Sequence, residues 1–519
     1  MTPATADGRW RGWPSPLTAA AVAFVWLAFT IGIRPLTLPE EGRYVGVAWE
    51  MLRSGDWLVP TLDGLPFFHK PPLFFWITAA SMQVFGASAA AARVAPLFGA
   101  FVGGLGFIWF IARRVGIVQA RWTGVVLLTL PFFFGGAQFA NLDMLVAGFI
   151  ALAIVFAADA ALAIDNGEPH RLALVAAWAA AALGILAKGL IGVVLPGLVL
   201  VLWLLVARRP KTILRLLSPL GLAVFLLVAA PWFIGVQARH PGFAHYFFVY
   251  QHFERFAATG FNNVQPWWFY FAAVPALTLP WSPWLLGASF RRRPGEADSA
   301  AATRQLMWIW LFGVLVFFSL PQSKPVGYAM PVLFPMAWLV ADAALAAWQL
   351  DRPWPRRAVQ ASLAVAAAMC VGAAIGSAAT YDRDNTLLAR SLLKLRSAGD
   401  PVVFGGEYFF DIPLHARLPE PVPVTGNWRD PKIAERDNWR RELAEAAPFA
   451  PALAARLLVT PEEGYALRCG TRPLWAVVRV DAEGRVSALP GASRVATANR
   501  ASLWKIPAAA CAATPASAP

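Results

Sequence analysis

The sequence contains few charged residues. Asp, Glu, Lys and Arg account for 14% of its 519 residues, whereas a soluble globular protein carries about 25%. Hydrophobic residues account for 58%, and the mean hydropathy is +0.54. A chain of this length would otherwise form about three soluble domains, but the composition excludes a soluble enzyme and a disordered chain. A polytopic α-helical membrane protein fits it.

Cysteine is scarce as well, with only Cys370, Cys469 and Cys511. None of them belongs to a C-x-x-C pattern, which excludes a zinc ribbon, a redox motif and a disulfide-dense secreted scaffold. Cys469 and Cys511 are predicted to lie on the same, oxidising side of the membrane, where a disulfide can form. The sequence leaves their pairing open because it does not give their geometry.

Acidic residues are outnumbered by basic ones, 30 to 44, and the net charge is +14. A nucleic-acid-binding protein would gather that charge in a patch interleaved with aromatic residues. Here most of it lies among the apolar segments, where the positive-inside rule explains it. No nucleic-acid partner is therefore expected.

Long apolar runs, by contrast, are abundant, and eleven of them come close to the roughly 20 residues that cross a bilayer. They are predicted at 17–33, 92–112, 121–137, 142–164, 172–187, 189–207, 217–236, 267–290, 304–320, 326–349 and 358–380. No small-residue cleavage site follows the first run, so it is predicted to be an uncleaved helix. With the N-terminus in the cytoplasm, every inside connection is basic, and residues 381–519 lie in the periplasm.

Two segments of the first periplasmic loop, residues 34–91, are predicted to be helices that do not cross. Leu73–Phe85 is apolar but only about a dozen residues long, which suits an interfacial or re-entrant helix. Residues 41–55 carry one apolar stripe at helical spacing and end at Gly55, a residue suited to a C-cap. They are predicted to form a helix on the membrane surface.

Residues 381–519 differ in kind from the membrane domain, residues 1–380. Strand-like runs at 401–404, 457–460 and 475–480 alternate with turn-rich links, which predicts a small α/β domain. The last ten or so residues are rich in Ala and Pro and are expected to be disordered.

Ionisable residues gather in the predicted outer loops, while the interiors of the spans are nearly empty of charge. The exceptions are Asp159 and Asp342, both nearer the inner ends. A transporter tends to hold ionisable residues near the bilayer midplane. The distribution therefore favours an enzyme at the outer membrane face, and a transporter or lipid flippase is the alternative.

Two acidic sites stand out. Glu40 and Glu41 directly follow the first span and are candidates for a general base or a metal ligand, or they stabilise a helix N-terminus. Asp143 follows Asn141 at the outer end of an apolar helix, where a carboxylate is costly unless it is paired or used.

The cationic candidates lie in the same loops. His69-Lys70 stands between aromatic residues and two prolines and can hold a phosphate or a metal, or Lys70 snorkels at the interface. Lys188 is a phosphate contact or a loop cation. His252 and Arg255 lie three residues apart on one helix face. Such cations and a divalent metal suit a reaction whose leaving group is a phosphate.

The run PEEGRY at 39–44, SGDWLVP at 54–60 and FHKP at 68–71 resembles the first periplasmic loop of the bacterial aminoarabinose transferases of lipid A. These enzymes belong with the protein-mannosyltransferase-like glycosyltransferases of the GT-C fold. Shorter matches continue the resemblance, which covers roughly residues 30–340. They lie at 142–143, 187–189, 245–256, 280–281 and 323–328.

The resemblance implies a GT-C membrane protein of the bacterial inner membrane, with juxtamembrane helices roofing a cavity. It implies a glycosyltransferase that inverts the sugar linkage, an undecaprenyl-phosphate-linked sugar as donor, and a lipid, glycan or protein as periplasmic acceptor. Glu40 and Asp143 match the catalytic centre. The expected substrate-binding residues are Arg43, Tyr44, Lys70, Lys188, Arg255, Lys324 and Tyr328.

Two residues depart from the family pattern. Glu40 stands where the family often has Asp, so its carboxylate reaches one methylene further. His69 stands where the aminoarabinose transferases have a Glu. In those enzymes this Glu, together with a His at the position of His252, is associated with a divalent metal. His69 and His252 are predicted to keep a site for zinc or magnesium, or the metal is lost.

Overall fold

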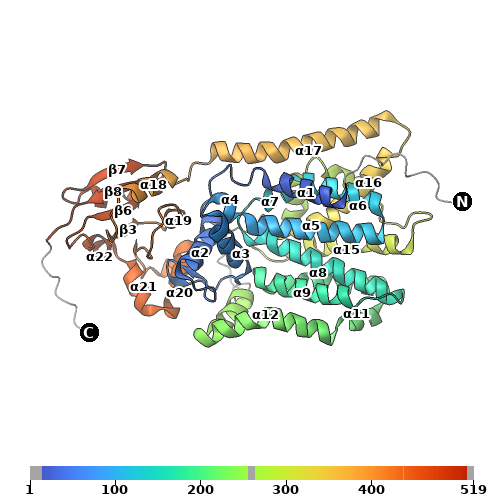
Figure 1. The fold of residues 1–519 in the computed structure, drawn as a ribbon, viewed down its shortest axis with the longest axis horizontal. Coiled ribbons are helices and arrows are strands. Elements are labelled where there is room, and N and C mark those ends of the chain that lie inside the picture. The colour runs from blue at the N-terminus through green and yellow to red at the C-terminus, as the bar shows by residue number, and fades with distance from the viewer. Residues whose placement is uncertain (1–14, 255–262, 436–437, 511–519) are drawn as a thin grey trace.

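The computed structural model describes residues 15–254, 263–435 and 438–510 (Figure 1). Long helices form a bundle at one end of the elongated molecule, and a domain with a β-sheet forms the other end. The short helices α2 (Glu40–Ser54), α3 (Leu73–Phe85) and α4 (Ala89–Ala92) lie between them. The long α17 (Pro353–Thr380) joins the bundle to the sheet domain.

Seven helices of the described residues are long and apolar enough to cross a membrane. They coincide with seven of the eleven predicted spans, and they confirm a membrane domain of many helices. They are α5 (Val94–Arg114), α8 (Leu142–Asp165), α9 (Arg171–Lys188), α12 (Pro219–Arg239), α15 (Asp298–Ser319), the pair η4 (Val326–Val332) and α16 (Leu333–Trp348), and α17.

The other four predicted spans are shorter or broken. The run 121–137 forms two helices bent by 68° at Leu130, where Pro131 removes a backbone donor and begins the second helix. Length and apolar character therefore support seven or eight crossings within the described residues, fewer than predicted. The elements are α1 (Pro16–Ala28), α6 (Ile117–Thr129), α7 (Pro131–Ala137), α10 (Ile191–Val206), α14 (Phe269–Leu277) and η3 (Ser282–Gly287).

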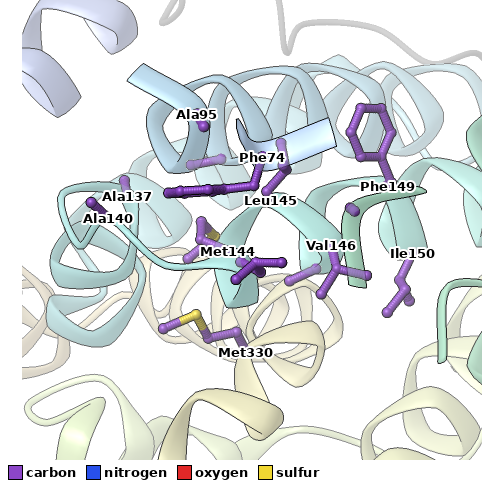
Figure 2. Close-up of a cluster of buried hydrophobic side chains, with 14 of the residues drawn as sticks. Phe74, Ala95, Ala137, Ala140, Met144, Leu145, Val146, Phe149, Ile150 and Met330 are labelled. Atoms are coloured by element: carbon purple, nitrogen blue, oxygen red, sulfur yellow. The ribbon is translucent and has the colours of Figure 1, made fainter. Parts of the chain in front are cut away.

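Helix α8 lies inside the bundle, between α5 and α9. The backbones of α5 and α8 come very close, since a Cβ atom on Gly148 would lie 2.0 Å from the carbonyl oxygen of Gly99. An apolar cluster surrounds the first half of α8 and fixes the helix directly after Asp143 (Figure 2). Its members include Phe74, Ala95, Ala137, Met144, Leu145, Phe149 and Met330.

Both aspartates inside the spans bind arginines. Asp159 pairs with Arg114, and Asp342 pairs with Arg293 at 2.8 Å and Arg304 at 2.6 Å. The Asp159 pair joins the C-terminal end of α5 to that of α8, at the end of the bundle away from the sheet domain. Because each aspartate is paired with arginine, we interpret both aspartates as structural residues.

Helix α2 confirms the predicted helix, and Gly55 ends it in the left-handed conformation with φ 72°. Its burial is wider than one stripe, however, because Glu41, Val45 and Glu50 are buried as well. Helix α3 packs against α2, and a Cβ atom on Gly42 would lie only 2.8 Å from the Cβ of Phe410 in the sheet domain. The helix that was predicted to lie on the membrane surface is therefore enclosed by the rest of the protein.

The sheet domain contains six strands in the order β5-β4-β3-β6-β8-β7, of which β5, β4, β3 and β6 are parallel and β8 is antiparallel to both neighbours. The three predicted strand runs are confirmed as β3, β5 and β6. The strands are β3 (Val402–Gly405), β4 (Val424–Thr425), β5 (Leu458–Val459), β6 (Leu474–Arg479), β7 (Ser493–Thr497) and β8 (Ala501–Ile506). The helices are α18 (Thr386–Leu395), α19 (Ile412–His415), η5 (Pro431–Glu435), α20 (Trp439–Ala446), η6 (Ala447–Phe449), α21 (Pro451–Leu457), α22 (Pro461–Ala466), η7 (Val480–Ala482) and α23 (Gly484–Ser487).

The cysteines fall into two kinds. Cys370 is a buried free thiol in α17, and Cys469 is disulfide-bonded. Cys511, its predicted partner, lies outside the described residues, as does the predicted disordered tail.

A short hairpin joins the first loop to the sheet domain. It consists of β1 (Thr61–Leu62) and β2 (Leu65–Pro66). The buried Glu50 carboxylate accepts hydrogen bonds from the backbone N–H of Asp63 at 2.6 Å and of Gly64 at 2.9 Å. Asp63 Oδ1 accepts the backbone N–H of Val422 at 2.8 Å, while Asp63 Oδ2 is buried with no hydrogen-bond partner among the described residues.

Asp63 makes this junction sensitive to pH. Burial and the nearby charge of Glu50 raise the pKa of the Asp63 carboxyl well above its ordinary value. The folded protein binds this proton more tightly than the unfolded chain does, so Asp63 lowers stability as the pH rises above the ordinary Asp pKa.

We expect Asp63→Asn to raise the unfolding temperature at pH 8 and to change it less at pH 5. Asn keeps the acceptor for Val422 and offers an amide donor to Glu50. Thermal unfolding of the detergent-solubilised protein at both pH values measures this, with the exposed Glu420→Gln as control. An equal loss of stability at both pH values would contradict the prediction.

Candidate active site

The candidate site lies at the N-terminal end of α8. Asn141 caps this helix, since its Oδ1 accepts the backbone N–H of Asp143 at 3.0 Å and its Nδ2 donates to Asp143 Oδ2 at 2.9 Å. Asp143 is buried in the first turn, where the helix dipole favours a carboxylate. The Asp143 carboxylate is therefore held in a fixed orientation.

Lys188 ends α9 beside this carboxylate. Its ammonium forms an ion pair with Asp143 Oδ1 and lies 4.4 Å from the ring centroid of Tyr328. It also interacts electrostatically with Lys70 and Glu40. The structure thus brings together five residues that were predicted from separate motifs. Two neighbouring lysines favour an anion between them, and a phosphate is such an anion.

Because Gly327 on η4 has no side chain, the Asp143 carboxylate can occupy the space beside it. A Cβ atom on Gly327 would lie 2.1 Å from Asp143 Oδ2 and 2.7 Å from its Cγ. The packing of η4 on α8 therefore depends on a glycine at this position.

The adjacent glutamates at the start of α2 differ sharply in their exposure to solvent. The Glu40 side chain is 55% exposed, whereas that of Glu41 is fully buried. Glu41 binds Arg34 and Arg93, with Arg93 Nε 2.9 Å from Glu41 Oε1. Burial alone would raise the pKa of Glu41, but the hydrogen bonds and charges of Arg93 and Arg34 outweigh it and lower the pKa to about 2.

Glu41 also holds the chain that leads into Asp143. Its Oε1 accepts the backbone N–H of Ala140 at 2.7 Å, and Arg34 donates to the carbonyl of Gln138 at 2.7 Å. Glu41 is therefore a structural carboxylate that positions the start of α8. Of the two glutamates, Glu40 offers the accessible carboxylate.

Arg43 links Glu40 to the sheet domain. Its Nη2 lies 3.1 Å from Glu40 Oε2, its Nη1 pairs with Glu442, and its guanidinium lies 4.8 Å from the ring centroid of Tyr44. Burial raises the pKa of the Tyr44 hydroxyl to about 12. The phenol therefore stays protonated at neutral pH and can donate a hydrogen bond.

His69 lies in a polar cluster next to Lys70. Its Nε2 lies 3.1 Å from the hydroxyl of Tyr246 and its Nδ1 lies 3.3 Å from the amide nitrogen of Gln251. Both partners belong to η2 (His245–Glu254), a π-helix. π-Helices are rare and are frequently found at functional sites. Glu445 of the sheet domain completes the cluster, with its Oε2 3.9 Å from His69 Nε2.

Only part of the predicted zinc or magnesium site lies among the described residues. Both ring nitrogens of His69 have polar partners, and across the described ranges no three His, Cys, Asp or Glu side chains are placed to hold a metal ion. The side chain of His252 lies outside the described residues. Metal binding stays a prediction, and no chemical step is assigned to it.

Lys324 and Arg255 were also predicted to bind substrate. The buried ammonium of Lys324 donates to the carbonyls of Gln265 at 2.9 Å and of Pro321, so it holds its own turn together. Arg255 lies outside the described residues.

Known proteins resemble this chain in sequence and in fold. Residues 69–234 match the family of dolichyl-phosphate-mannose-protein mannosyltransferases. The undecaprenyl phosphate-alpha-4-amino-4-deoxy-L-arabinose arabinosyl transferase of Aeromonas salmonicida is 32% identical over 342 residues, which cover 63% of this chain and 60% of that protein. The crystal structure of ArnT from Cupriavidus metallidurans, bound to undecaprenyl phosphate, is 25% identical and covers 96% of this chain and 99% of its own, with a TM-score of 0.79.

The chain is a homologue of the aminoarabinose transferases. The resemblance seen in the sequence is thereby confirmed, and so is the GT-C fold. The archaeal oligosaccharyltransferase AglB from Archaeoglobus fulgidus shares the fold, with a TM-score of 0.54 at 12% identity over 90% of this chain and 69% of its own. In sequence, this homologue spans about 60% of the length of the curated relatives it matches.

Proposed function

We propose that this protein is a glycosyltransferase that moves a sugar from undecaprenyl phosphate to an acceptor at the outer membrane face. The observation that carries the proposal is the cluster of Asp143, Lys188, Lys70 and Glu40. It places two cations for a phosphate beside two carboxylates for an acceptor. The names of the matched relatives support aminoarabinose as the sugar, and the resemblance of the first loop to the lipid A transferases supports lipid A as the acceptor.

The reaction is a single displacement with inversion. The bond between the sugar C1 and the donor phosphate oxygen breaks, an acceptor oxygen bonds to C1, and undecaprenyl phosphate leaves as an anion. Lys70 and Lys188 stabilise the charge that develops on this leaving group. An acceptor hydroxyl would pass its proton to Asp143 or Glu40. An acceptor phosphate is already ionised, and the carboxylates then only orient it.

The same proposal gives the orientation in a bacterial inner membrane. The basic connections between the predicted spans belong in the cytoplasm by the positive-inside rule, together with the N-terminus. The candidate site and the C-terminal domain then face the periplasm, where the acceptor is found.

The transporter or lipid flippase is the weaker candidate. It requires ionisable residues near the midplane, but Asp159 and Asp342 are both paired with arginines. The relatives and the matching folds are transferases.

Mass spectrometry of lipid A and other envelope glycans tests the proposal. Cells without the protein are compared with cells that contain the intact form or Asp143→Ala at matched levels. We expect an added pentose- or hexose-sized mass only with the intact protein. No difference in any fraction, at normal expression, would contradict the transferase and favour the transporter.

Gly327→Ala tests the site geometry. The new methyl group collides with the Asp143 carboxylate and should displace it from Lys188. A misplacement of about 1 Å can cost about a hundredfold in rate, so we expect a loss of that order with little change in expression. Gly287→Ala is the matched control, because its Cβ would meet only Ala343 at 3.5 Å. Equal rates for both variants would contradict this geometry.

A further inference from the structure

Helix α20 of the sheet domain brings two glutamates to the first loop. Glu442 and Glu445 lie three residues apart, on one face of the helix. Glu442 pairs with Arg43 and Glu445 lies beside His69, in each case about 375 to 400 residues away along the chain. The resemblance to known transferases that the sequence carries does not extend to this helix.

Glu442 anchors Arg43. The Glu442 side chain is only 6% exposed, the Arg43 side chain is 18% exposed, and Glu40 at the other end is 55% exposed. The guanidinium thus binds one buried carboxylate firmly and presents its second arm to Glu40 at 3.1 Å. Without Glu442, the whole guanidinium would be available to Glu40 and would pair with both its oxygens.

Glu445 holds the other side of the site. Its oxygens accept hydrogen bonds from the hydroxyls of Tyr246 at 2.9 Å and Tyr250 at 2.7 Å, and Arg441 pairs with it. The Tyr246 hydroxyl also lies 3.1 Å from His69 Nε2. This network joins α20 and η2 to the residue that precedes Lys70.

From these contacts we propose that α20 completes the active site. Glu442 is a positioning residue that acts on Glu40 through Arg43, and Glu445 positions the His69-Lys70 segment against η2. This inference rests on the proposed transferase function. It assigns to the C-terminal domain the role of positioning residues of the active site.

The test uses the purified full-length protein with three variants, Glu442→Gln, Arg43→Gln and the double variant. A hydrogen bond to a charged group contributes about a tenfold to hundredfold effect. We expect Glu442→Gln to lower kcat per folded molecule by about that factor while the KM for the donor changes little. The unfolding temperature should fall, because a buried ion pair is broken. Since Glu442 acts through Arg43, the double variant should be no slower than Arg43→Gln alone. The exposed Glu435→Gln, from the segment before α20, is the control.

An unchanged kcat for folded Glu442→Gln would overturn the inference, as would losses that multiply in the double variant. Should Glu442→Gln not fold, Arg43→Lys keeps the charge but lacks the planar fork whose two arms hold Glu442 and Glu40, and it should show the same loss in kcat. If the intact protein transfers the sugar and the Glu442→Gln variant is equally active, only this inference is refuted. No transfer by the folded intact protein refutes the proposed function as well.

Discussion

Replacing Asp143 by Asn should lower the rate of sugar transfer by a factor of about 10² to 10⁴ per folded molecule, the range that is typical for loss of a general base. Asn keeps the size of the side chain and its hydrogen bond to Asn141, but it gives up the ion pair with Lys188. The Lys188 ammonium then keeps the like charge of Lys70, the charge of Glu40 and the Tyr328 ring as neighbours. Both the charge and the orientation that the site supplies to the acceptor are lost.

Asp159→Asn is a closely matched control for this experiment. Asp159 lies on the same helix, is as deeply buried, and pairs with Arg114 at the opposite end. We expect it to lower the unfolding temperature while the rate per folded molecule stays near that of the intact protein. A comparable loss of rate in both variants would show that Asp143 matters only for the fold.

Replacing Glu41 by Gln should have the largest effect on stability. The substitution leaves Arg93, which is fully buried, and Arg34 without their carboxylate. Breaking a buried pair in this way costs about 3–5 kcal/mol. The amide oxygen of Gln can still accept the backbone N–H of Ala140, but its amide nitrogen replaces an oxygen that accepts from Arg34, Arg93 and the backbone N–H of Thr37. Reduced expression and a lower unfolding temperature in detergent would show this loss.

The neighbouring Glu40→Gln provides the contrast. Its side chain is largely exposed and binds only one arm of Arg43, so we expect an unchanged unfolding temperature and a large loss of transfer. The pKa of Glu41, at about 2, lies below the ordinary value of 4.5. Its stabilisation is therefore fully present above pH 4.5 and declines as the pH falls toward 2. The same effect on stability from both glutamine variants would contradict these separate roles.

The sequence predicted the fold where the signal is local. The apolar runs of α5, α8 and α9, the spacing of α2 and the strand run of β6 need only neighbouring residues, and the structure confirms them. The division of 121–137 into two helices was missed because an apolar run with an internal proline reads as one span.

The sequence also singled out several residues that the structure brings together, but it did not predict which of them contact one another. Asp143 and Lys188 each stood in an apolar surrounding, where an unpaired charge is costly, and Tyr328 was implied by the resemblance. The structure brings the three together. The partners of Glu41 were missed, although Arg93 between apolar residues signals a carboxylate elsewhere. Glu442 carried no signal, since its contact with Arg43 joins residues that are 399 positions apart.

Transfer by the purified protein tests the central claim most directly. The full-length chain in detergent receives undecaprenyl phosphate-linked aminoarabinose and lipid A, and released undecaprenyl phosphate and modified lipid A are both measured. We predict equal amounts of the two products with the intact protein, and neither above background with Asp143→Asn. Donor that stays intact in the presence of the folded protein and several lipid, glycan and protein acceptors would contradict the account.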